Sequence, residues 1–589
     1  MNGDRETALR QLVEDLLAAA RVRVERPAAS EAARGRALTL VQHVEGHLLV
    51  RARSLDTPLL VSIVGPTGAG KSSLLNTIAG RAASPTSVLR PTTRHAVALL
   101  HPSDREAILA GALAAVEPER VELIADDRTD PGVVVVDAPD LDSIEHANRE
   151  LSDHLVEASD LAVFVTTATR YADRVPWSVL ARLRERELST VVVVNRMPPE
   201  PESRATVLTA LGRLLAEAGL RGSIERAEGG VLVIDVREGA IERSTESLDT
   251  AAVRPLLDLV DRLRGDRDAR RRLAARSLAG AMAGVVPLID EVASDIDHES
   301  VDVEALRRLA STRFDAALGS LREALSGGTF LREEALRQWQ DYVGADEITR
   351  LFSRGLVRIR ATLGAVLRPV RAPTDAVRKG TLDDVIGVAR VHSAEAARRV
   401  ATEYADAPLL AGRVADDGTL WLPAADFEQR LRARLQDWVA SIAEDISRTG
   451  QSKALLARGG SIGVNAVGTG VMLATFIHTG GLTGAELGVA AATAFVNQKV
   501  LSALFGEAAM VELVQRAASR LDEALEQTFE EERDRFERLL PPADYLPDLS
   551  ANLRQVAHRI AALEPTLEDE VSAAFGMPET NTTLRAGRA

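Results

Sequence analysis

The apolar positions of the chain follow two different periods. From about residue 58 to 240, short Val-rich runs alternate with segments of helical period. The strands predicted from these runs are 59–64, 95–101, 132–136, 161–166, 190–195 and 231–235. Strands that alternate with helices form a mostly parallel sheet with helices on both faces. The pattern therefore predicts an α/β domain, which we place at residues 57–245.

On both sides of this domain the apolar residues recur at helical spacing. Residues 5–24 and 31–54 are predicted to form two amphipathic helices within an N-terminal segment, 1–56. After residue 250 the helical stretches are 251–298, 302–327, 345–370, 381–403, 425–457, 484–535 and 550–575, with a loop at 404–424 and a break at 540–548. We predict a large all-α stalk over 246–589, against which the helices of 1–56 pack.

One segment of this helical region, residues 459–506, is almost free of charge, with only Glu486 and Lys499. Two apolar stretches, 462–477 and 487–496, flank a Gly-rich turn. Each is shorter than the roughly 20 residues that a membrane-spanning helix needs. Two interpretations stay open, a hairpin buried inside the helical bundle and a hairpin that inserts into or lies on a bilayer.

The chemistry of the α/β domain is carried by one loop between the predicted strand 59–64 and a predicted helix. The loop reads Gly65, Pro66, Thr67, Gly68, Ala69, Gly70, Lys71, Ser72 and Ser73, a complete G-x-x-x-x-G-K-[ST] motif. Its glycines let backbone N–H groups surround phosphate oxygens at a helix N-terminus. Lys71 is placed to reach the β- and γ-phosphates, and the Ser72 hydroxyl to bind Mg²⁺. We predict a P-loop that binds a magnesium-bound nucleoside triphosphate.

Composition narrows the function further. Lys71 is one of only four lysines among 71 basic residues, which argues against a chance match to the motif. The formal charge of −15 argues against a nucleic-acid partner. The absence of cysteine excludes disulfides, cysteine zinc sites and thiol catalysis. Residues 1–24 contain no apolar secretory signal, so a cytoplasmic location is expected.

Three further positions belong to the predicted site. Asp137 ends the apolar run 133–136, as a strand that delivers a carboxylate to Mg²⁺ requires. Thr93 lies in a polar loop before the strand 95–101, where a hydroxyl can reach the same ion. Asn195 and Arg196 lie at the end of the strand 190–195. His43 and His47 are four residues apart on one helix face, but they lack the His-Glu-x-x-His pattern of a zinc site, and we predict an exposed pair.

These motifs together resemble a known class. The run from Gly70 to Asn76, then Pro91-Thr92-Thr93-Arg94 and Asp137-Ala138-Pro139, is similar to the translation-factor-related P-loop GTPases. With the helical tail and the apolar hairpin, the chain most resembles bacterial dynamin-like proteins. The resemblance implies that Lys71, Thr93 and Asp137 are catalytic, that Ser72, Thr93 and Asp137 bind Mg²⁺, and that Asn195 and Arg196 hold the base of GTP.

The chain departs from this class at three positions. Asp140 replaces the glycine that usually follows Asp-x-Pro, and Thr67 occupies the P-loop position where eukaryotic dynamins carry a catalytic glutamine. Pro198 replaces the aspartate that reads guanine, because the motif is Asn195-Arg196-Met197-Pro198. Guanine selectivity is therefore expected to be weakened, and ATP is not excluded as the substrate.

Two functions of different classes follow. The first is a dynamin-like nucleoside triphosphatase that couples Mg²⁺-dependent hydrolysis of GTP to movement of the helical stalk, with self-association and a membrane surface as partners. The second is a nucleotide-gated scaffold with little hydrolysis, favoured by the three departures. A ribosome-associated GTPase is disfavoured, because a basic RNA-binding domain is missing from the acidic sequence.

Overall fold

In a computed structural model of the 589-residue chain, two compact units are found. Unit 1 contains Met1–Glu299 and Asp544–Ala589, and unit 2 contains Ser300–Ala543. The residues that the structure describes are 2–26, 28–84, 95–114, 116–140, 146–171, 174–185, 187–219, 231–239, 241–242, 246–326, 375–449, 507–563 and 566–577. Each unit is described by itself.

Unit 1 contains a seven-stranded sheet in the order β3-β2-β4-β1-β5-β6-β7. The strands are β1 (Leu59–Val64), β2 (Ala96–Leu100), β3 (Val121–Ala125), β4 (Val133–Asp137), β5 (Leu161–Thr167), β6 (Ser189–Met197) and β7 (Leu232–Arg237). Only β2 and β4 pair antiparallel. Every residue of β1, β4 and β5 is buried, as expected for central strands covered on both faces. The mostly parallel α/β fold is confirmed.

The sequence pattern missed β3, which lies at the edge of the sheet. Its exposed Glu122 and half-buried neighbours do not form the continuous apolar run that marks the central strands. A short hairpin of β8 (Ile241–Glu242) and β9 (Ser247–Leu248) was also not predicted. Two-residue strands are too short to leave a periodic signal.

Helices cover both faces of the sheet. The helices of this domain are α4 (Lys71–Ala79), α5 (Arg105–Ala110), α6 (His146–Ala158), α7 (Arg174–Glu185), α8 (Pro201–Ala218) and α9 (Arg254–Gly265), with short 3₁₀ turns at Pro102–Asp104 and Pro118–Arg120. Leu155 of α6, Leu183 of α7 and Leu211 of α8 join one core with β1, β4, β5 and β6. The other face receives α4 and α9, both of which contact β4. This arrangement leaves the carboxyl ends of the strands for the phosphate loop.

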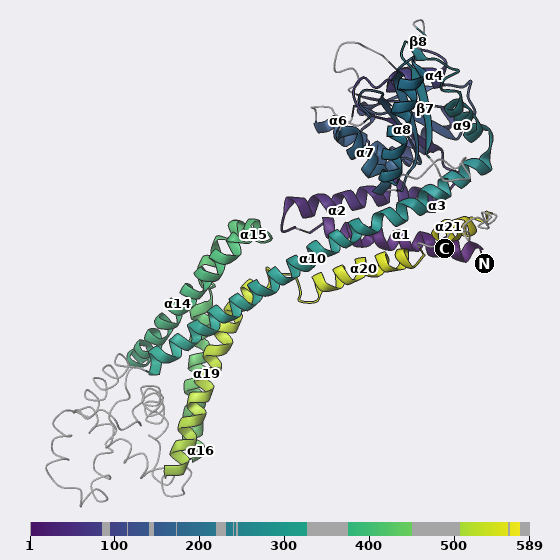
Figure 1. The fold of residues 1–589 in the computed structure, drawn as a ribbon. Helices are drawn as coiled ribbons and strands as arrows, with labels where there is room; N and C mark the ends of the chain where they lie inside the picture. The colour runs from purple at the N-terminus through teal and green to yellow at the C-terminus, as the bar shows by residue number, and fades with distance from the viewer. Residues whose placement is uncertain are drawn as a thin grey trace, which may run out of the picture. The chain divides into compact units, whose positions relative to one another are not determined.

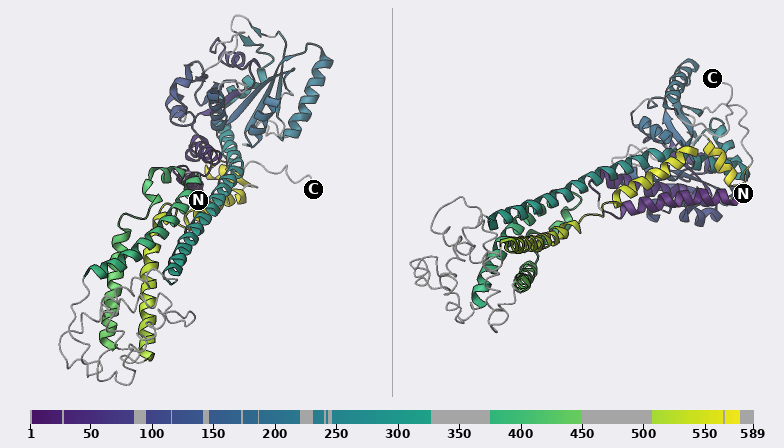
Figure 2. Two further views of the ribbon diagram at one scale, coloured as in Figure 1. Left: turned by 90° about the vertical axis from the view of Figure 1, so that its left-hand side faces the viewer. Right: turned by 90° about the horizontal axis from the view of Figure 1, so that it is seen from below.

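A helical layer completes unit 1. It consists of α1 (Asn2–Val24), α2 (Glu31–His43), a π-helical segment (Val44–Leu48), α3 (Leu49–Arg53), the first part of α10 (Arg267–Ser326), α20 (Tyr545–Leu563) and α21 (Leu567–Ala574). Figures 1 and 2 show α1 and α20 running beside α10. The buried Arg23 pairs with Glu299 of α10 at 2.6 Å, and Arg36 pairs with Asp295 at 2.6 Å. The amino-terminal helices are therefore held on α10 by ion pairs as well as by apolar contacts.

The prediction of an exposed pair at His43 and His47 is wrong. Both side chains are buried, at 4% and 1% exposure. His43 Nδ1 lies 2.6 Å from Glu157 Oε2 of α6, and His47 Nε2 lies 3.0 Å from Ser277 Oγ of α10. The helical segment that carries the two histidines packs between α6 and α10. Tertiary packing therefore buries a helix face that would be exposed to water in an isolated helix.

The described residues of unit 2 form helices joined by short turns, with no strand among them. Besides the last part of α10 it contains α14 (Asp375–Asp406), α15 (Ala411–Asp416), a 3₁₀ turn (Gly418–Trp421), α16 (Phe427–Thr449) and α19 (Glu507–Glu537). The predicted loop 404–424 thus holds α15 and a 3₁₀ turn. α10 is a single helix of 60 residues where the pattern predicted an interruption at 299–301. These three residues, Glu299, Ser300 and Val301, include no glycine or proline that would end a helix. The large helical region is confirmed.

The core of unit 2 gathers aromatic residues that are scarce in the chain as a whole. Phe536 contacts Phe314 and Tyr404, each at 5.7 Å between ring centroids. Phe427 and Phe529 meet at 6.3 Å in an edge-to-face arrangement. Aromatic pairs add to area burial in this geometry. The core therefore joins α10, α14, α16 and α19 with few large side chains.

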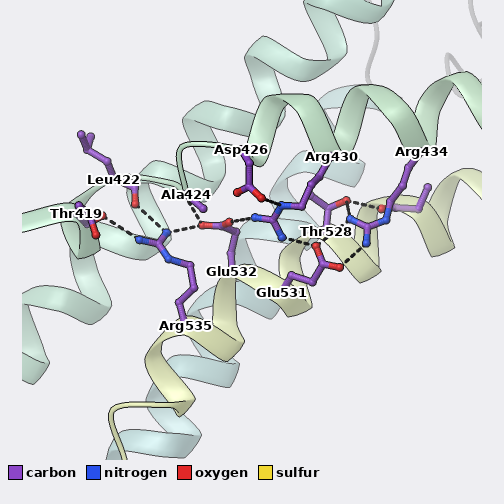
Figure 3. Close-up of polar contacts among 11 residues, drawn as sticks. Thr419, Leu422, Ala424, Asp426, Arg430, Arg434, Thr528, Glu531, Glu532 and Arg535 are labelled. Carbon is purple, nitrogen blue, oxygen red and sulfur yellow. Dashed lines mark hydrogen bonds and ion pairs between the residues drawn. The ribbon is translucent and has the colours of Figure 1, made fainter. Parts of the chain in front are cut away.

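An ionic network centred on the buried Glu532 ties α16 to α19 (Figure 3). The Glu532 carboxylate is completely buried and accepts hydrogen bonds from Arg430 Nη2 at 2.7 Å and Arg535 Nη1 at 2.7 Å. It also accepts the backbone N–H of Ala424 at 2.9 Å. Arg434 donates to the neighbouring Glu531 at 2.5 Å. Because each oxygen of Glu532 has a partner, its burial is compensated.

Membrane contact is not decided by the described residues. The apolar segment 459–506, with both of its open interpretations, lies outside them. Among the described helices, α10 contains one stretch that could cross a membrane by length and composition, and 61% of that stretch is buried inside the protein. Burial of this kind is typical of a core helix of a soluble protein.

Candidate functional site

The P-loop lies between β1 and α4, as the sequence predicted, and its backbone requires glycine. Gly65, Gly68 and Gly70 have φ values of +155°, +73° and +103°. A Cβ at Gly65 would overlap the backbone oxygen of Val165 in β5, and one at Gly70 would overlap the Asn195 amide. The P-loop thus packs closely against the carboxyl ends of β5 and β6. Glycine is needed both for the dihedral angles and for the close approach of other elements.

Lys71 opens α4 and is buried, at 5% exposure. Its ammonium donates to the Gly65 carbonyl at 3.0 Å and lies 3.4 Å from the Pro66 carbonyl. The third partner is the carboxylate of Asp140, with which it forms an ion pair. Lys71 is therefore folded back over the loop, in the position from which a P-loop lysine reaches terminal phosphates.

The predicted magnesium-side residues lie together. Asp137 ends β4, and its Oδ2 accepts hydrogen bonds from Ser72 Oγ at 2.6 Å and Ser84 Oγ at 2.9 Å. Burial raises the pKa of the Asp137 carboxyl, while the Lys71 charge and the two serine hydroxyls act in the opposite direction. Asp137 Oδ1 is buried and has no hydrogen-bond partner within the described part of the chain.

This donor set fits Mg²⁺. A buried carboxylate oxygen without a partner, beside a hydroxyl, is a hard oxygen site of the kind that Mg²⁺ prefers. The ion would be held by Ser72 and Asp137. No cluster of three acidic or histidine side chains that could hold a metal occurs among the described residues. That is consistent with magnesium in nucleotide sites, where phosphates and water supply the other ligands.

Asn195 and Arg196 lie near the end of β6, and their side chains differ in burial. Asn195 is buried, and its Nδ2 donates to the Ala69 carbonyl of the P-loop at 3.1 Å. Its Oδ1 accepts the backbone N–H of Arg196 at 2.8 Å. Arg196 is exposed and has a positive φ of +54°. Asn195 therefore fastens the predicted base-binding loop to the P-loop, and the Arg196 side chain extends into solvent.

Arg170 is a further basic residue at the P-loop, and the sequence reasoning missed it. It follows β5, and its Nη1 donates to the Thr67 carbonyl at 3.2 Å. The carboxyl ends of neighbouring parallel strands meet at one edge of a sheet, so an arginine just after the strand 161–166 was a signal that could have been followed. Ser84 was missed too, and nothing in its sequence context marks it.

The remaining site residue, Thr93, lies outside the described residues, as do its neighbours 85–94. Of the other predicted residues, 65–73, Asp137 and Asn195 form one contiguous site, with Arg196 at its edge. Asp140 was noted in the sequence only as a departure from the usual glycine. Its ion pair with Lys71 is a tertiary contact between residues 69 positions apart in the chain. No local sequence pattern predicts such a contact.

Comparison with known proteins agrees with this site. Residues 60–196, less than a quarter of the chain, match the family described as 50S ribosome-binding GTPase. This region is a P-loop GTPase domain. The matched residues run from β1 to the Asn195-Arg196 end of β6 and so contain the whole site. The predicted P-loop GTP hydrolase is confirmed, and no curated protein matches the chain by sequence.

Solved structures that are similar include two described as an oligomerised bacterial dynamin pair that senses and tethers membranes over long range. One is 13% identical and covers 90% of this chain and 92% of its own, with a TM-score of 0.39. The other is 11% identical and covers 97% and 95%, with a TM-score of 0.37. Toc33 from Arabidopsis thaliana, bound to Mg²⁺ and GMPPNP, is 14% identical and covers 40% of this chain and 93% of its own, with a TM-score of 0.25.

Proposed function

We propose that the chain is a dynamin-like GTPase that hydrolyses GTP with Mg²⁺ and transmits the reaction to its helices. The observation that carries the proposal is the assembly of Lys71, Ser72 and Asp137 at the P-loop, where Asp137 Oδ1 is buried and has no hydrogen-bond partner among the described residues. The catalytic domain would be residues 57–245. The segments 1–56 and 246–589 would form the helical part that changes conformation in response to the nucleotide. The ribosome binding in the family's description is not carried over, because the match is confined to the nucleotide-binding region.

Within this site each residue has a defined task. The P-loop N–H groups and Lys71 would bind the phosphates and stabilise the charge that develops on them during in-line attack by water. Ser72 and Asp137 would hold Mg²⁺, which supplies charge neutralisation when it is bound. Arg170, whose guanidinium lies at Thr67, would add positive charge on the side of the loop away from Asp137. Thr93 is proposed as the switch threonine from the sequence alone.

Phosphate release by the full chain tests the proposal. We expect Mg²⁺-dependent hydrolysis in the wild type and its loss, by at least a hundred-fold, in Lys71→Ala. Arg213→Ala removes an exposed positive charge from α8 of the same domain and should leave the rate unchanged. Hydrolysis that is equally fast in Lys71→Ala would contradict the proposal.

A nucleotide-gated scaffold with little hydrolysis is the alternative that the Thr67, Asp140 and Pro198 departures favour. A single-turnover assay with GTP and with ATP, each with and without liposomes, separates the two functions. A complete lack of hydrolysis with tight binding would establish the scaffold. The same assay reports base preference, which we expect to favour GTP by less than in enzymes that retain the guanine-reading aspartate, because Pro198 offers no side-chain acceptor.

Membrane contact and self-association complete the proposal. The low charge of 459–506 and its two apolar stretches support a hairpin that lies on or inserts into a bilayer, most simply at the cytoplasmic face of a membrane. The bacterial dynamin pair that is similar in structure is described as oligomerised and as tethering membranes. Sedimentation of the chain with GDP and with a non-hydrolysable GTP analogue would reveal nucleotide-dependent assembly.

A further inference from the structure

Asp140 occupies the position where GTPases of this class carry a glycine, and its carboxylate reaches the centre of the phosphate site. The residue is 7% exposed, and it forms an ion pair with the equally buried Lys71. The two residues that precede it in the chain are both held by hydrogen bonds. Ala138 donates its N–H to the Ile63 carbonyl at 3.1 Å, and Ser152 Oγ of α6 donates to the Pro139 carbonyl at 2.8 Å. The carboxylate is thus positioned by the fold.

The Lys71 ammonium has three donors, and within the described part of the chain three acceptors surround it. Two are the backbone carbonyls of Gly65 and Pro66, which belong to the P-loop, and the third is Asp140. A phosphate oxygen that binds Lys71 must therefore take the place of one acceptor or share the ammonium with it. Asp140 is the only one of the three that carries a negative charge.

The negative charge of Asp140 determines how strongly it opposes a phosphate at Lys71. Two acceptors of one ammonium lie within about 5 Å of each other, a distance at which like charges in a buried site repel strongly. The terminal phosphate of a triphosphate brings more negative charge next to Lys71 than a diphosphate does. A glycine at position 140 would impose no such repulsion.

We propose that Asp140 is a specificity-determining residue that lowers the preference of this site for nucleoside triphosphates over diphosphates, by competing with the terminal phosphate for Lys71. The proposal rests on the proposed GTPase function of the same site. Asp140 would therefore weaken the binding of nucleoside triphosphates, compared with GTPases that have glycine at this position. It would weaken the binding of diphosphates far less.

Binding of fluorescently labelled GDP and of a labelled non-hydrolysable GTP analogue to the full chain, both with Mg²⁺, tests the proposal. In Asp140→Asn, which keeps the shape but removes the charge, we expect the affinity ratio of triphosphate to diphosphate to rise at least ten-fold. Asp140→Gly should raise it as well. Asp140→Glu keeps the charge and should stay near the wild-type ratio. Asp127→Asn removes an exposed carboxylate of the same domain and should change neither affinity.

The outcomes are distinct. A ratio that does not move in Asp140→Asn and Asp140→Gly, in proteins with wild-type melting temperatures, would overturn this inference and leave the proposed function intact. Weaker triphosphate binding in Asp140→Asn would also overturn it and would instead assign Asp140 to the Mg²⁺ site. Failure of the wild type to bind either nucleotide would overturn the proposed function together with this inference.

Discussion

At the scale of single residues, both the dihedral angles of the P-loop and its close contacts with other elements require glycine. Gly65 and Gly68 both have positive φ, at +155° and +73°. Only Gly65 meets another element, the Val165 carbonyl of β5, whereas a Cβ at Gly68 would meet nothing within 4 Å. A comparison of substitutions at the two glycines therefore distinguishes the cost of backbone strain from the cost of a steric overlap with β5.

We expect Gly65→Ala to lower the apparent free energy of unfolding by more than about 2 kcal/mol, because the Val165 backbone cannot move without disturbing the sheet. Gly68→Ala should cost about 1 kcal/mol, the penalty of a left-handed conformation alone. Urea unfolding followed by circular dichroism measures both. Equal losses would show that contact with β5 does not determine the need for glycine.

Asp126, in the loop after β3, makes stability depend on pH. Its carboxylate accepts hydrogen bonds from Arg128 Nε at 2.7 Å and Nη2 at 2.6 Å, and these lower its pKa from 3.8 to about 2. The unfolded chain therefore binds a proton at a higher pH than the folded chain. The contribution of Asp126 to stability is complete above about pH 4 and is lost as the pH falls toward 2.

Urea unfolding of the wild type and Asp126→Asn between pH 7 and pH 2 tests this dependence. The wild type should be the more stable protein at pH 7, and the difference should shrink steadily below about pH 4. Arg128 is largely exposed, so water screens the pair and the difference should be modest. A difference that is constant across this range would rule out the ion pair as its source.

At the scale of elements, unit 2 depends on one buried acid. Glu532 of α19 receives Arg430 of α16, Arg535 of its own helix and the Ala424 N–H. Without this carboxylate the Ala424 N–H loses its acceptor. Arg430 keeps its ion pairs with Asp426 and Glu531, and Arg535 keeps its hydrogen bonds to two backbone carbonyls. The junction of α16 and α19 is therefore expected to be sensitive to Glu532 and insensitive to exposed acids on the same helix.

We expect Glu532→Ala to destabilise the protein by about 1 to 3 kcal/mol, the typical cost of leaving a buried donor without its acceptor. Glu512→Ala, on the same helix, removes a carboxylate that is 69% exposed and lies 3.8 Å from Arg516, and it should have little effect. Thermal unfolding of the two variants gives the comparison. Similar melting temperatures would mean that the network does not stabilise unit 2.

At the scale of the whole molecule, the GTPase match occupies less than a quarter of the chain, and most of the described residues outside the α/β domain are helical. A long helical region is more than nucleotide hydrolysis alone requires, which is why we propose that it responds to the nucleotide. The apolar segment 459–506 carries the proposed membrane contact. This contact is a prediction from sequence, and it can be tested directly.

In liposome flotation with anionic vesicles, we expect the wild type to float and Ile462→Asp to remain at the bottom of the gradient, because a charge in the apolar stretch opposes its burial in lipid. Val511→Asp places the same charge at a 50% exposed position of α19 and should float like the wild type. A wild-type protein that does not float with or without nucleotide would exclude the membrane contact.

The sequence by itself determined the central strands, the P-loop and the acid at Asp137, because these depend on local periodicity and on motifs of fixed spacing. Six of the seven sheet strands were predicted, and the edge strand β3 was missed because half of its surface meets water. Tertiary structure alone decided the burial of His43 and His47 and the place of Arg170 at Thr67. It also decided the pairing of Asp140 with Lys71. These features join positions far apart in the chain, and only the packing of the strands and helices brings them into contact.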